Sequence, residues 1–137
     1  MLHNGPVAVL RRVLYLDALV TSVVSIVLIA VPGTVLRLLG QPAPADEAWL
    51  RLLGVAGLTL SLLMVLVAHR VEELWWWCWA FVILEVAGAA VGSLHLLVGL
   101  PEGAATWPWW LVAGVSWLFA GAFLWGIARA GVEAPTP

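Results

Sequence analysis

The sequence contains no lysine and a single cysteine, Cys78, and charged residues make up only 10% of its 137 residues. A soluble domain carries about a quarter charged residues, so this composition argues against an ordinary soluble protein. One cysteine excludes both an internal disulfide and a CxxC redox centre. Six arginines against eight acidic residues give a net charge of −2, which provides no electrostatic support for binding nucleic acid.

Long apolar runs take up most of the chain, which is 64% hydrophobic. A helix needs ~20 apolar residues to cross a hydrocarbon core of ~30 Å. We therefore expect an all-α membrane protein, a single membrane domain over residues 1–137 in contact with the lipid bilayer. The predicted spans are residues 13–31, 48–68, 74–98 and 108–128, and the first helix could begin as early as Val7. The first run is longer than the core of a usual signal peptide and no clear A-x-A cleavage site follows it, so we expect it to be retained.

Proline, glycine and acidic residues mark the ends of these spans. Pro32 and Gly33 end the first span, because proline cannot continue the helical ladder. Residues 34–39 could form a short interfacial helix. Asp46 is placed to cap the second span, and Gly99 closes the third.

The arginines indicate how the spans are oriented. Arg11, Arg12, Arg70 and Arg129 lie on one predicted side. The opposite side has only Arg37 and Arg51. Because cytoplasmic loops carry the excess of positive charge, this bias places both termini in the cytoplasm. Short connections make sequential helices antiparallel neighbours, which predicts an up-down-up-down bundle of four transmembrane helices.

Small residues indicate where the helices could touch one another. The candidate packing glycines are Gly54, Gly57, Gly88, Gly92, Gly114 and Gly121. The third span has a GxxxG pair, and small residues at that spacing let helix backbones approach closely in lipid. The alternative is that glycine is simply frequent in membrane helices.

Two acidic residues within the predicted spans, Asp17 and Glu85, are the main functional candidates. A carboxylate at mid-bilayer costs ~2.5–3.5 kcal/mol on insertion scales, so something must offset that cost. Helical spacing puts Glu85 on the face of the third span that carries Gly88 and Gly92, and it puts Thr21 one turn from Asp17. Burial disfavours the charged form of a carboxyl group, which suits proton binding near neutral pH. The alternative is that both acids are paired and only orient helices.

Arg51 and His95 complete the candidate proton or substrate site, since both lie near the predicted outer ends of their helices. They could meet across the bundle. Alternatively, Arg51 anchors its helix at the interface and His95 is an ordinary interfacial histidine. His69 lies on the other predicted side, so one haem cannot be held by His69 and His95 together. We therefore expect no metal, cofactor or catalytic residues.

Several short stretches resemble small four-helix integral membrane proteins of high-GC bacteria, a group similar in size and span count to DoxX-like proteins. They are Tyr15-Leu16-Asp17-Ala18, Pro32-Gly33, Leu38-Leu39-Gly40-Gln41-Pro42 and Leu50-Arg51-Leu52-Leu53-Gly54. The resemblance covers roughly the first half of the chain and implies the four-span topology and a multi-pass protein of the bacterial plasma membrane. It implies no activity.

Three classes of function remain. The first is an integral membrane protein without evident enzymatic activity, such as an accessory or assembly subunit of a larger membrane complex. The second is a small proton-coupled transporter, acting as a homo-oligomer and using Glu85 and Asp17. The third, an enzyme acting on lipid or quinone, is disfavoured because one cysteine and three histidines do not assemble a metal cluster or a nucleophile–base pair.

Overall fold

The computed structural model describes residues 7–42 and 46–133, with side chains up to residue 130, and all regular secondary structure in these ranges is helical. The elements are α1 (Ala8–Ala30), α2 (Pro32–Leu38), α3 (Ala48–His69), α4 (Val71–Leu74), the 3₁₀ turn η1 (Trp75–Trp77), α5 (Cys78–Val98) and α6 (Trp107–Glu133). Four apolar stretches are long enough to cross a membrane: Ala8–Ala30, Ala48–His69, Val71–Val98 and Trp107–Ala130. The predicted all-α chain with four such helices is confirmed. The chain ends themselves lie outside the described residues.

Two helix boundaries differ from the predicted ones, those of the third and fourth spans. α1 begins at Ala8, next to Val7, the earliest start predicted for it. It can include Arg11 because that side chain has partners: its Nε donates to the carbonyl oxygen of Ala68 at 3.2 Å, and its guanidinium forms an ion pair with Glu72. The third span is interrupted by η1, and α6 runs to Glu133, five residues beyond the predicted end at residue 128.

Local residues explain most of the helix ends. α1 stops at Ala30 and α2 starts at Pro32, where a fixed φ and a missing N–H suit a first helical position. Asp46, predicted as the cap of α3, lies one residue before the actual N-cap Glu47, and it accepts a hydrogen bond from the backbone N–H of Ala48 at 2.8 Å. α5 ends at Gly99, whose φ of 102° suits a residue without a Cβ atom.

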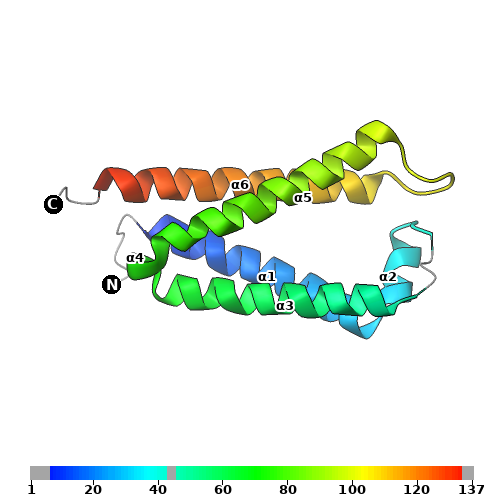
Figure 1. Ribbon diagram of the computed structural model, residues 1–137, viewed down its shortest axis with the longest axis horizontal. Coiled ribbons are helices and arrows are strands. Elements are labelled where there is room, and N and C mark those ends of the chain that lie inside the picture. The colour runs from blue at the N-terminus through cyan, green and yellow to red at the C-terminus, as the bar shows by residue number, and fades with distance from the viewer. Residues whose placement is uncertain (1–6, 43–45, 134–137) are drawn as a thin grey trace.

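The long helices pack as two pairs, α1 with α3 and α5 with α6 (Figure 1). The two pairs share a core at the end of the molecule near α4. It consists of Leu10, Val13, Leu14, Ala18, Met64, Val67, Ala68, Val71, Cys78, Phe81, Val82, Phe119, Phe123, Ile127 and Ala130. Phe81 of α5 stacks on Phe123 of α6 with ring centroids 6.1 Å apart. Burial of large apolar side chains is therefore concentrated at one end of the helices.

A second connection joins the two pairs at the other end of the molecule. The backbone N–H of Ala105, before α6, donates to the carbonyl oxygen of Gly40, after α2, at 2.9 Å. The Gln41 amide donates to the carbonyl oxygen of Ala105 at 2.8 Å. The two helix pairs are thus held together at both ends of the molecule.

Candidate functional site

A crevice of about 470 Å³ lies between the two helix pairs, and residues from all four long helices line it. We call it the carboxyl crevice. Its polar lining residues are Asp17, Thr21 and Ser25 from α1, Glu85 from α5 and Ser116 from α6. The rest of the lining is apolar: Val20, Val24, Leu28, Leu53, Ala56, Gly57, Leu60, Leu111, Val112, Val115 and Phe119. The two intramembrane acids predicted as candidates therefore belong to one site.

Asp17 is the more deeply buried of the two acids, with 2% of its surface exposed. The Thr21 hydroxyl, one helical turn further along α1, donates to its Oδ1 at 3.2 Å. Its other carboxyl oxygen, Oδ2, is buried and has no hydrogen-bond partner in the described part of the chain. A buried polar atom without a partner costs about 1–3 kcal/mol, so this oxygen does not contribute to stability through a hydrogen bond among the described residues.

Glu85 enters the same crevice from the opposite helix pair and is half-buried. It lies beside Ser116 of α6 and close enough to Asp17 for two negative charges to repel each other. Like charges in a poorly hydrated site do not both ionise readily. A negative charge on one of these two carboxyl groups therefore disfavours a negative charge on the other.

Ser116 is a member of this site that sequence reasoning missed. It contacts the α5 backbone, because a Cβ atom built on Gly88 would lie 3.0 Å from its Oγ. A signal was present, since Ser116 is the only hydroxyl residue within the predicted fourth span. It was overlooked because nothing local connects it with Glu85, which lies 31 positions earlier.

Serine and glycine residues form the contact between α1 and α3 that backs the crevice. The Ser22 hydroxyl donates to Ser61 Oγ at 2.8 Å, and Ser61 donates in turn to the Leu58 carbonyl oxygen at 2.8 Å. A Cβ atom on Gly54 would lie 2.7 Å from the carbonyl oxygen of Ser25, and one on Gly57 would collide with the Ser25 hydroxyl. The close approach of α1 and α3 thus requires glycine at both positions.

The other candidate packing glycines divide into two groups. Gly92 lies against α6, where an added Cβ atom would be 3.1 Å from the backbone nitrogen of Ala113. Gly114 and Gly121 do not face another helix of the chain, since an added Cβ atom at either would meet nothing within 4 Å. For contacts within one chain, the prediction at these two positions is wrong. The α6 glycine at a contact is instead Gly126, which packs on Leu10 of α1.

Arg51 and His95 lie apart from the crevice and each has its own neighbour. His95 stacks on Trp109 of α6 with centroids 4.1 Å apart, and its Nδ1 lies 3.0 Å from the carbonyl oxygen of Val91. Arg51 forms an exposed ion pair with Glu47 at 3.6 Å. Among the described residues, the partners of Arg51 and His95 are therefore these neighbours, and the meeting of the two across the bundle stays a prediction.

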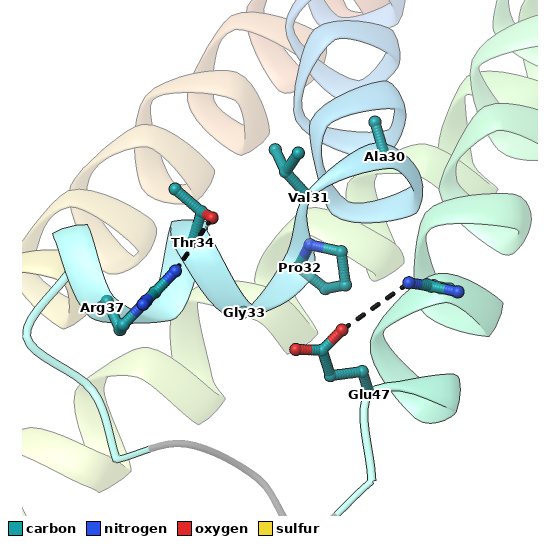
Figure 2. Close-up of a pocket in the computed structure, with 8 residues that line it drawn as sticks. Ala30, Val31, Pro32, Gly33, Thr34, Arg37 and Glu47 are labelled. Atoms are coloured by element: carbon teal, nitrogen blue, oxygen red, sulfur yellow. Dashed lines mark hydrogen bonds and ion pairs between the residues drawn. The ribbon is translucent and has the colours of Figure 1, made fainter.

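Arg51 instead lines a second pocket of about 400 Å³ around the start of α2 (Figure 2). Arg37 donates there to the Thr34 hydroxyl at 3.3 Å. Figure 2 shows Glu47 between α2 and α3. Its carboxylate offsets the positive charge of Arg51 there. Both arginines are exposed and already have partners, so this pocket has weaker binding features than the carboxyl crevice.

Within residues 7–42 and 46–133, no group of three or more His, Cys, Asp or Glu side chains could hold a metal ion. Comparisons of the chain with protein-family models, with curated proteins and with solved structures found no match. The resemblance to DoxX-like proteins therefore stays a prediction. The function has to be argued from the carboxyl crevice.

Proposed function

We propose that this chain is a multi-pass integral membrane protein that works as a proton-coupled transporter, with Asp17 and Glu85 as its proton-binding groups. The observation that carries the proposal is the meeting of two carboxyl groups, one from each helix pair, in one otherwise apolar crevice. Arginine distribution supports an up-down-up-down bundle with both termini in the cytoplasm. The resemblance to small bacterial membrane proteins suggests the bacterial plasma membrane.

Electrostatics explains why such a pair suits proton exchange. Each carboxylate is costly in a poorly hydrated site, and two neighbouring negative charges raise the cost further. Binding one proton removes both the repulsion and one of the two buried charges. A bound proton can then leave when another positive charge takes its place, which is the exchange that a proton-coupled transporter needs.

The alternative is that the chain is a structural subunit of a larger membrane complex. In that case the hydrogen bonding of the two acidic side chains should differ. A carboxyl group that only orients helices should have its oxygens bonded, because membrane helices use polar side chains to hydrogen-bond their neighbours. Asp17 Oδ2 has no such partner among the described residues. The four long helices of one chain all contribute residues to the crevice, and a homo-oligomer could extend it into a path across the bilayer.

The test compares proton flux in vesicles for wild type, Glu85→Gln and Asp17→Asn, using an entrapped pH-sensitive dye and an imposed pH gradient. Both substitutions keep the side-chain shape and remove the titrating group. We expect vesicles that contain the wild-type protein to dissipate the pH gradient faster than empty vesicles. In both variants, the rate of dissipation above that of empty vesicles should be lower by about tenfold or more.

Glu102→Gln is the matched control, because Glu102 is exposed in the loop between α5 and α6 and does not line the crevice. It should retain wild-type flux. Circular dichroism and a monodisperse elution profile establish that each variant is folded. Equal flux in wild type and Glu85→Gln would contradict the proposal and favour the structural role.

A further inference from the structure

We infer that the carboxyl crevice binds a lipophilic organic cation, a singly charged amine or phosphonium group carried on an apolar body. This inference rests on the proposed transport function and names its substrate class. It depends on four features of the crevice: its negative charge, its mostly apolar lining, the Asp17 oxygen without a hydrogen-bond partner, and its opening on the side of the molecule.

The charged side chains that line the crevice determine the sign of the charge that its ligand carries. Asp17 and Glu85 are the only titratable side chains among the described residues that line the crevice. α3 contributes aliphatic residues and Gly57, and α6 contributes Ser116 among apolar residues. The crevice therefore presents negative charge without a neighbouring arginine to neutralise it, which favours a cation and disfavours an anion.

The volume and the apolar lining of the crevice determine what kind of molecule carries that charge. A volume of about 470 Å³ lies within the usual range for small-molecule sites, which are lined mostly by apolar side chains with a few polar groups. Hard metal cations are surrounded by oxygen ligands on all sides, whereas most of the lining of this crevice is aliphatic. An organic cation with an apolar body matches both the charge and the walls.

The unpartnered oxygen of Asp17 is an independent indication of a ligand. Asp17, which lines the crevice, has only 2% of its surface exposed, and its buried Oδ2 has no hydrogen-bond partner in the described residues. A bound cation would supply the missing interaction, either as an N–H donor or as a positive charge. The hydroxyl of Thr21 keeps the other oxygen in place.

Access to the crevice is from the side of the molecule. Val24, Leu53 and Leu111 line it, yet each remains more than half exposed on the outside of the helix pairs. In a bilayer these side chains face acyl chains, so a ligand that partitions into lipid reaches the carboxyl groups laterally. This route selects lipophilic cations over strongly hydrated ones.

The experiment measures binding of radiolabelled tetraphenylphosphonium to the purified full-length protein in detergent by equilibrium dialysis, with detergent alone as background. Tetraphenylborate, which has nearly the same shape and the opposite charge, is the ligand control. We expect saturable phosphonium binding of up to one per chain, and no saturable borate binding. Binding should weaken as the pH falls, by up to about tenfold per pH unit for one-for-one exchange with a proton.

Variants locate the site. Glu85→Gln and Asp17→Asn should weaken phosphonium binding about tenfold or more, while Glu102→Gln stays within about twofold of wild type. Ala56→Phe places a large side chain in the apolar wall and leaves both acids intact. It should abolish phosphonium binding although both carboxyl groups remain, which would show that the apolar wall, and not charge alone, holds the ligand.

Two results would overturn the inference: saturable tetraphenylborate binding of equal strength, or phosphonium binding unaffected by Glu85→Gln and Asp17→Asn. Absence of phosphonium binding in a protein that conducts protons through Glu85 would reject the substrate class and leave the proposed function standing. Specific phosphonium binding without proton flux would support the cation site and reject transport.

Discussion

Individual polar residues show how far local spacing predicts contacts. Asp17 and Thr21 are four positions apart on one helix, and the Thr21 hydroxyl does bond the Asp17 carboxylate. Ser116 and Glu85 lie on different helices, and no periodic pattern connects them. Sequence reasoning therefore found the two acids of the crevice and the hydroxyl on the same helix, but it missed the hydroxyl supplied by α6.

Glycines provide a residue-scale test of the packing. Gly54→Ala should destabilise the protein by about 1–3 kcal/mol, because the new Cβ atom would crowd the Ser25 carbonyl oxygen and Ile29. Gly114→Ala adds the same methyl group where nothing lies within 4 Å, so it should be neutral or stabilising by up to about 1 kcal/mol. Unfolding of each variant by SDS in mixed micelles measures the difference. Equal effects of the two substitutions would show that α1 and α3 do not approach closely at Gly54.

At the scale of helices, the ends set by local residues were predicted well. Pro32 and Gly99 act through their own backbone preferences, so the end of α1 and the end of α5 lie within one residue of the predicted positions. The start of α1 was predicted only as a range between Val7 and residue 13, and Arg11 lies within that range. The partners of Arg11, Ala68 at the end of α3 and Glu72 in α4, cannot be read from the neighbouring sequence.

The contacts of Arg11 connect α1 with the end of α3 and with α4, and they can be measured. A double-mutant cycle with Arg11→Met and Glu72→Gln should give a coupling free energy of about 0.2–1 kcal/mol, because both side chains are more than one-third exposed. Arg11→Met should cost more than Glu72→Gln, since it also leaves the Ala68 carbonyl oxygen without its side-chain donor.

Arg70→Met is the comparison for this cycle, because Arg70 pairs only with Glu73 on the adjacent turn. It should destabilise the protein less than Arg11→Met in the same SDS unfolding assay. If Arg70→Met were the more damaging change, the Arg11 contacts would not hold α1 in place.

At the scale of the whole molecule, the two helix pairs are joined at both ends, and the crevice lies between these connections. The shared core near α4 and the Gly40–Ala105 contact are each built from segments far apart in the sequence (Figure 1). This arrangement leaves Asp17 and Glu85 facing each other across the interface between the pairs. The site is therefore a consequence of how the pairs meet, not of any single helix.

The proposed orientation can be tested by cysteine labelling in a Cys78→Ser background, where the native thiol is buried and its removal leaves no competing site. A membrane-impermeant maleimide added to intact cells should label Glu102→Cys, in the predicted outer loop. It should label Glu73→Cys only after permeabilisation, because that residue lies on the predicted cytoplasmic side. The reverse pattern would invert the topology, and labelling of both in intact cells would contradict the four-span arrangement.

Composition and spacing were sufficient to establish four apolar helices, their approximate ends and the two acids within them. These properties follow from hydropathy, proline and glycine preferences and helical periodicity, all of which act over a few neighbouring residues. The pairing of α1 with α3 and of α5 with α6, the placement of Ser116 and the outward orientation of Gly114 and Gly121 were settled only by the folded arrangement. They depend on packing between residues far apart in the chain, for which a helix that is apolar on nearly every face carries no directional signal.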